Sequence, residues 1–216
     1  MTFNTEQTMS KGLEGTRIAV VYHSGYGHTE KVAKAVARGA GSVDGVESLL
    51  ISVEDIDGHW DALEQVDGIV FGAPTYMGSA SAEFKKFMDA TSRNVFAKGS
   101  KWADKVAAGF TNAASRSGDK LATLQQIAIF AAQHRMHWVN LGLPPGHNHS
   151  KSTEDTLNRH GFFLGAAAQS NADESADVTP PDADLRTAEF LGARVAAVAA
   201  QLAAGRAVLN AAEAAV

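Results

Sequence analysis

The segment Ser24-Gly25-Tyr26-Gly27-His28-Thr29 combines two hydroxyls with two glycines, and a helical pattern follows it. Backbone N–H groups at the start of a helix, together with the positive end of its dipole, favour an anion such as a phosphate. A dinucleotide-binding loop would need glycine at Glu30, and a nucleoside-triphosphate loop would need lysine at His28. The segment therefore predicts a site for one terminal phosphate without metal. The alternative is a serine-glycine turn that binds nothing.

Two later segments have the composition expected around a flat ring. The first, Pro74-Thr75-Tyr76-Met77-Gly78-Ser79, places an aromatic ring beside a thioether, and both side chains can pack against a planar ligand. The second, residues 111–118, is small and polar, which lets the backbone approach such a ligand closely. Taken alone, each pattern is also typical of ordinary packing.

Metal and thiol chemistry find little support in the sequence. The chain has no cysteine, which excludes disulfides, a cysteine-ligated zinc site and a cysteine nucleophile. His147, His149 and His160 lie in a long loop without the spacing of a defined metal site. Glu154 and Asp155 are interpreted as solvated loop charges. No metal site is predicted.

Short apolar runs alternate with helical periods along the chain, and these elements must position the three polar segments. The runs are continuous rather than alternating, which indicates strands buried on both faces. Strands are expected over residues 18–22, 46–52, 68–72, 106–111 and 137–140. Helices are expected from His28 onward and over residues 84–91, 119–133 and 185–202, with Gly205 ending the last one.

This alternation predicts an α/β fold, a doubly wound parallel sheet of five strands with helices on both faces. Ligands of such sheets bind outside the carboxyl ends of the strands, which is where the three polar segments fall. We expect a flexible arm over residues 1–16, one domain over 17–204 and a tail over 205–216. A long loop is expected over 142–182.

Composition and charge exclude several classes of protein. A net charge of −5 over 216 residues argues against a nucleic-acid partner, which requires a basic surface. No apolar run approaches eighteen residues and the first residues are polar, so neither a membrane span nor a signal peptide is predicted. The expected location is the cytoplasm.

In their order and spacing, the polar segments resemble those of the WrbA-type quinone reductases, the tryptophan-repressor-binding-protein family. The most specific stretches are SGYGHTEKVA at 24–33, FGAPTYMGSASAEFKKFMDAT at 71–91, and the HRM and LGLP stretches within 134–143. The resemblance covers residues 17–202. It implies a flavodoxin-like fold that binds FMN, reduction of a quinone or other small acceptor by NADH or NADPH, and a homotetramer.

The resemblance also implies roles for particular residues. Those expected to hold the FMN phosphate are Ser24, Gly25, Tyr26, Gly27, His28 and Thr29. Those expected to flank the isoalloxazine are Pro74, Thr75, Tyr76, Met77 and Gly78, and those expected at its pyrimidine side are Asn112, Ala113, Ala114, Ser115 and Gly118. Tyr26, Phe96 and His134 are expected to meet the substrate, with His134 also in the cofactor site.

His134 raises a question of geometry. The helix over 119–133 starts at the carboxyl edge of the sheet, so its far end should lie ~20 Å away, near the opposite edge. His134 is then out of reach of its own flavin, and we expect it to serve a neighbouring subunit. The alternative is a buried histidine that continues the apolar stripe through Ala128 and Ala131.

The expected chemistry takes place on the flavin, and no side chain is assigned as a catalytic acid, base or nucleophile. Nicotinamide and quinone would use one cleft in turn, which predicts ping-pong kinetics. Backbone N–H groups of the second and third polar segments would stabilise charge on the reduced ring. The main alternative is a flavodoxin-like FMN electron carrier that oxidises no nicotinamide, and a regulatory binding module ranks last.

Overall fold

The computed structural model describes residues 15–213. Its central sheet has a path of five parallel, hydrogen-bonded strands. Their order is β2 (Val46–Ser52), β1 (Thr16–Tyr22), β3 (Gly68–Tyr76), β5 (Val106–Ala113) and β6 (His137–Trp138). This confirms the predicted doubly wound fold. Most of the expected arm lies outside the described residues, and Thr16 already belongs to β1.

The three central strands carry the most completely apolar runs. β1, β3 and β5 are buried along nearly their whole length, whereas β2 at the edge is only partly covered. This agrees with the rule that strands covered on both faces have continuous rather than alternating apolar residues.

The fifth strand position is divided between two short strands. β6 pairs with the start of β5, Val106 opposite His137, and β7 (Ala166–Gln169) pairs with its end, Phe110 opposite Ala166. The prediction of a strand over 137–140 was therefore too long, and β7 was missed within the expected loop. Its sequence Ala-Ala-Ala-Gln has low strand propensity, so pairing with β5 imposes the conformation.

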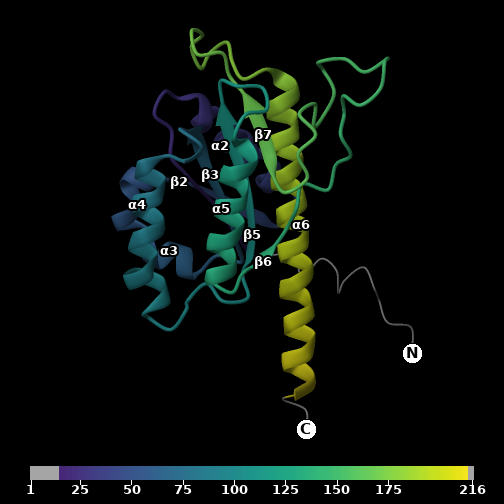
Figure 1. Cartoon of the computed structure of the whole chain (residues 1–216). Helices are drawn as coiled ribbons and strands as arrows, with labels where there is room; N and C mark the ends of the chain where they lie inside the picture. The colour runs from purple at the N-terminus through teal and green to yellow at the C-terminus, as the bar shows by residue number, and fades with distance from the viewer. Residues whose placement is uncertain (1–14, 214–216) are drawn as a thin grey trace, which may run out of the picture.

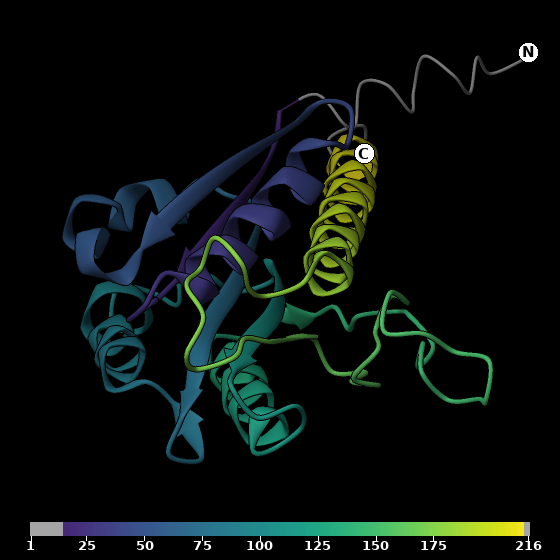
Figure 2. The same ribbon diagram turned by 90° about the horizontal axis from the view of Figure 1, so that it is seen from above.

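Helices cover both faces of the sheet, as Figure 2 shows. On one face lie α2 (His28–Gly41) and α6 (Asp182–Glu213), and on the other α3 (Trp60–Glu64), α4 (Ala82–Thr91) and α5 (Lys120–Gln133). A short 3-10 helix, η1 (Val53–Gly58), follows β2, and a π-helical turn, η2 (Ser92–Phe96), follows α4.

The helical period of α5 predicts a buried stripe through Leu121, Leu124, Ala128 and Ala131, and the structure confirms it for Leu124 and Ala131. Leu121 is 47% exposed, while Thr123, Ile127 and Phe130 are buried. The helix is apolar on more than one side, so the sequence period alone could not select the inward face. Phe130 joins an aromatic cluster with Phe71, Phe87 and Trp102.

The last helix corrects a second prediction. α6 does not end at Gly205 but continues to Glu213, so the expected tail over 205–216 is largely helical, and Figure 1 shows it extending beyond the sheet. A single glycine costs about 1 kcal/mol relative to alanine, which the surrounding alanine and leucine residues offset. Near its start, Gly192 approaches the backbone of α2 so closely that a Cβ would lie 2.0 Å from Val36 O.

Among the described residues, α6 is also the one helix long and apolar enough over 182–212 to span a membrane, by length and composition alone. Its first half is part of the core: Leu191, Val195, Ala196 and Ala199 are buried against the sheet and α2.

The carboxyl ends of β1, β3 and β5 lie at one edge of the sheet and position the three polar segments. β3 and β5 are longer than predicted, so residues 74–76 and 112–113 are strand ends rather than loops. Beyond β3, Met77 and Gly78 turn the chain into β4 (Ser79–Ala80), with φ of 48° and 88°. Positive φ at both positions is the mark of a type I′ hairpin.

Candidate FMN site at the carboxyl edge of the sheet

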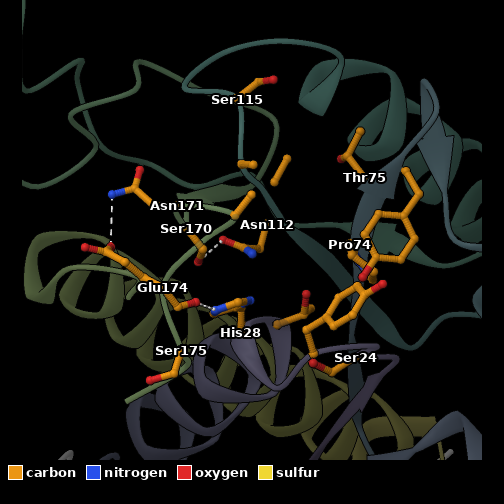
Figure 3. Close-up of a pocket in the computed structure, with 16 residues that line it drawn as sticks. Ser24, His28, Pro74, Thr75, Asn112, Ser115, Ser170, Asn171, Glu174 and Ser175 are labelled. Atoms are coloured by element: carbon orange, nitrogen blue, oxygen red, sulfur yellow. Dashed lines mark hydrogen bonds between the residues drawn. The ribbon is translucent and has the colours of Figure 1, made fainter. Parts of the chain in front are cut away.

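A cavity of about 680 Å³ opens where these strands end, within the size range of small-molecule sites (Figure 3). Eleven of the residues predicted for the cofactor line it: Ser24, Tyr26, His28, Thr29, Pro74, Thr75, Tyr76, Asn112, Ala113, Ala114 and Ser115. The predicted residues outside this lining are Gly25, Gly27, Met77, Gly78, Gly118, His134 and Phe96.

The first polar segment presents unsatisfied polar groups to this cavity. Ser24 Oγ is buried and has no hydrogen-bond partner. Gly27 adopts φ 84° as the N-cap of α2 and offers no side-chain cap, so the first N–H groups of the helix remain available. At Gly25 a Cβ would lie 2.9 Å from the Tyr76 hydroxyl. A free serine hydroxyl next to free helix amides fits a phosphate.

Sequence reasoning missed a fourth segment of the cavity wall, which contributes Ser170, Asn171, Ala172, Glu174 and Ser175. It follows β7, and two contacts hold it against the start of α2. His28 Nε2 donates to Glu174 O at 2.9 Å, and Lys31 Nζ donates to Asp177 O at 3.2 Å. Its small polar composition, similar to that of residues 111–118, was the only signal in the sequence.

A chain of threonine hydroxyls fixes the ends of β3 and β5. Thr111 Oγ1 donates to Ala73 O at 2.8 Å, so it accepts from Thr75 Oγ1, 2.7 Å away. Thr75 Oγ1 in turn accepts from Thr123 Oγ1 at 2.8 Å. Because each hydroxyl has one proton, these directions follow from the first bond. The cavity wall at Thr75 is therefore held rigidly.

Asn112 is buried and supplies directed donors at the opposite wall. Its Oδ1 accepts from Ser170 Oγ at 3.0 Å, which Figure 3 shows as a dashed line. The side-chain NH₂ group is then free for a ligand.

The mouth of the cavity is aromatic and apolar. Tyr26 is 78% exposed, Tyr76 is 38% exposed, and their rings meet edge to face with centroids 6.5 Å apart. Partial burial raises the pKa of Tyr76. Met77 at the hairpin tip is fully exposed. Glu174 is the one carboxylate among the lining residues, and it belongs to the fourth segment.

Two of the predicted residues outside the first cavity, Phe96 and His134, line a second cavity of about 480 Å³ together with the end of α4. His134 follows α5 and lies three residues before His137, which pairs with the first residue of β5. The expectation that His134 lies far from the carboxyl edge is confirmed, since Asn112 stands at the other end of β5.

His134 is almost fully buried, with its ring 4.9 Å from the centroids of both Trp102 and Phe130. Thr91 Oγ1 donates to Met88 O, so His134 Nε2 donates to Thr91 Oγ1 at 2.8 Å. Nδ1 is thus an unprotonated acceptor, and it has no partner. Burial lowers the pKa of His134 to about 4, so the ring is neutral near pH 7.

Glu154 and Asp155 in the long loop are exposed, as the sequence interpretation expects, and they also form ion pairs. Glu154 bonds to Arg116 and Arg159, and these bonds lower its pKa to about 2. Asp155 pairs with Arg186. Of the three loop histidines, His160 pairs with buried Asp184 and His147 with Glu154, and no cluster suited to a metal ion occurs within residues 15–213.

Comparison with known proteins shows the family. The family described as NADPH-dependent FMN reductase matches residues 16–144. Flavodoxin FldP of Pseudomonas aeruginosa is 45% identical over 192 residues, covering 87% of this chain and 98% of that protein. An NAD(P)H dehydrogenase (quinone) of Sinorhizobium fredii is 31% identical over 204 residues, covering 87% of this chain and 98% of the relative.

Solved structures agree with this assignment. The crystal structure of a flavodoxin, WrbA-like protein from Agrobacterium tumefaciens is 41% identical, with a TM-score of 0.67 over 87% of this chain and 99% of that chain. A flavodoxin from the Archaea, 20% identical with a TM-score of 0.61, shows the fold alone.

Fold and site together define a flavodoxin-like FMN-binding oxidoreductase. The chain belongs to the NADPH-dependent FMN reductase family. This confirms the resemblance to WrbA-type proteins and the expectation of FMN as cofactor.

Proposed function

We propose that the protein is an NAD(P)H:quinone oxidoreductase, which uses FMN to pass two electrons from NADH or NADPH to a quinone in the cytoplasm. The observation that carries the proposal is the mouth of the first cavity, where the exposed aromatic rings of Tyr26 and Tyr76 lie. Planar molecules stack on such a surface, whereas a protein electron partner is usually steered by charge.

Bound FMN would supply the two-electron redox chemistry. Ser24 Oγ and the first amides of α2 would hold its phosphate, and Thr75 and Asn112 would hold the ring from opposite walls. Tyr26 would pack against the nicotinamide and later against the quinone. Because one cleft would serve both, the oxidised nucleotide must leave before the quinone enters, and the kinetics would be ping-pong.

Two relatives support different functions for this chain. The quinone dehydrogenase of Sinorhizobium fredii aligns with nearly its whole length, which supports the quinone. The 45% identity to a protein named flavodoxin supports the second candidate, an FMN carrier that oxidises no nicotinamide. Glu174 is the one carboxylate among the described lining residues, and this low charge favours the reductase.

Steady-state assays separate the two candidates. Purified protein should absorb near 450 nm after gel filtration and should oxidise NADH or NADPH with benzoquinone, with parallel double-reciprocal plots. Flavin-loaded protein without turnover on either nucleotide would refute the reductase and favour the carrier.

The second cavity motivates the quaternary part of the proposal. Phe96 is 49% exposed and lies beside buried His134, and neither lines the first cavity of its own chain. We propose a homotetramer in which Phe96 and His134 of one subunit complete the substrate cleft of another.

Mixed tetramers test this arrangement. His134→Ala subunits keep their own FMN, whereas Ser24→Asp subunits should lose it, because a carboxylate would face the phosphate. Each parent should be nearly inactive and their mixture should regain turnover, since the intact FMN and the intact His134 then share a cleft. A monomer in light scattering, or no regained activity in the mixture, would refute the arrangement.

A further inference from the structure

Lys120 is a buried cation that the proposed function does not use. It is the first residue of α5, and none of it is exposed. Its Nζ donates to Ser115 O at 2.5 Å and to Arg116 O at 3.0 Å. Both carbonyls belong to the third polar segment, and Ser115 lines the cavity. The ammonium therefore lies behind the cavity wall and is bound to it.

Stability does not account for a lysine at this position. Burial disfavours the charged form and lowers the pKa of Lys120 to about 8. The positive end of the α5 dipole also opposes a cation in the first turn. Within residues 15–213 no carboxylate lies within ion-pair distance of Nζ, and the nearby Asp184 already pairs with Arg159 and His160.

The two peptide groups bound by Lys120 have a fixed orientation relative to its ammonium group. In a trans peptide the C=O and the following N–H point in opposite directions. Because the carbonyls of Ser115 and Arg116 face the ammonium, the N–H groups of Arg116 and Ser117 point away from it. Neither N–H donates a hydrogen bond to another described residue. Lys120 thus orients and polarises two free donors that directly follow Ser115, the last residue of this segment to line the cavity.

We propose that Lys120 is a positioning residue whose positive charge, acting through the Ser115 and Arg116 peptide groups, selectively stabilises the negative charge that FMN gains on reduction. The proposal rests on FMN binding and not on the identity of the electron acceptor. It assigns the third segment an electrostatic as well as a steric function.

Two neutral variants test the charge. Lys120→Met removes the charge and the donors, whereas Lys120→Gln keeps donors for the two carbonyls. The affinity for oxidised FMN is measured by fluorescence titration, and the midpoint potential of bound FMN by dye-coupled reduction. A change in potential reports how much more strongly the reduced form is bound than the oxidised form.

Lys105 provides a matched control. Its Nζ also donates to two backbone carbonyls, Glu64 O at 2.9 Å and Val66 O at 2.6 Å, and burial also lowers its pKa. It lies one residue before β5, at the end of the sheet opposite the cavity. Lys105→Gln should lower the melting temperature and leave the potential of FMN unchanged.

Both Lys120 variants should bind reduced FMN at least about tenfold more weakly relative to oxidised FMN, which lowers the two-electron potential by about 30 mV. If Lys120→Met fails to fold, Lys120→Gln is the deciding variant. A wild-type potential in Lys120→Gln, or equal losses of affinity for both forms, would overturn the proposal and leave Lys120 a structural clamp. Such an outcome would leave the result of the quinone assay unchanged, so the Lys120 proposal and the proposed reductase function can be refuted independently.

Discussion

The cavity at the carboxyl edge takes its polar atoms from backbone amides, hydroxyls and one side-chain amide, whereas the cavity at His134 is built around a buried imidazole between aromatic rings. The first is assembled where parallel strands end, so short motifs that follow those strands specify most of it. The second joins Phe96 after α4 to His134 after α5, and only packing brings them together. The comparison suggests that the first cavity should respond to loss of single polar groups and the second to pH.

The largest expected effect is on the free energy of unfolding, which should depend on pH through His134 in the second cavity. The folded-state pKa of His134 is about 4, below the usual 6.5, so the unfolded chain takes up a proton first as pH falls. Stability should therefore be lost between pH 6.5 and 4, by about 3 kcal/mol from this group. Urea titrations of wild type and His134→Gln should diverge in slope against pH over this range.

His137 serves as the control for that experiment, because its side chain is 56% exposed. His137→Gln should follow the wild-type pH dependence. Identical slopes for wild type and His134→Gln would contradict the assignment of a neutral buried ring.

A smaller effect is expected when the first cavity loses one hydroxyl. Ser24→Ala should weaken FMN binding about 10- to 100-fold, because a hydrogen bond to a charged group contributes about 1.5–3 kcal/mol. The apoprotein should not be destabilised, since Ser24 Oγ has no partner in it. Fluorescence titration measures the affinity, and Ser42→Ala at the other end of α2 is the control. Equal affinities would remove Ser24 from the phosphate site.

The fourth segment of the first cavity should limit cofactor release. Lys31→Met removes the bond to Asp177 O, worth about 1 kcal/mol, and should speed FMN dissociation about fivefold. Stopped-flow release of FMN measures the rate. Lys34→Met is the matched control, because Lys34 pairs with Glu30 and does not touch the segment. Equal rates in the two variants would show that the bond does not hold the segment closed.

The smallest effect concerns the hairpin beside the first cavity. Met77 has φ 48° and its side chain is fully exposed. Met77→Asn creates an Asn-Gly turn, the preferred type I′ sequence, and should stabilise the protein by about 0.5 kcal/mol. A melting temperature about 1–2 °C higher is expected. A lower melting temperature would mean that the Met77 side chain makes a stabilising contact.

Most of the first cavity could be predicted because each of its three motifs directly follows a strand with a clear apolar run. The fourth segment could not, because Ala166–Gln169 has no strand signal and becomes a strand only by pairing with β5. The ion pairs of Glu154 were missed for a similar reason, since Arg116 is 38 residues away and meets it only in the folded chain. The end of α6 was misjudged because one glycine is a weak stop signal among alanines.

The sequence by itself determined the order of the elements, the parallel sheet and the position of the phosphate loop, because these depend on local periodicity and on short motifs next to strands. Only the tertiary structure decided which further residues of α5 are buried, that Phe96 joins His134 in one cavity, and that Lys120 is enclosed behind the third segment. These features depend on burial and on contacts between segments that are far apart in the sequence, so no local sequence pattern predicts them.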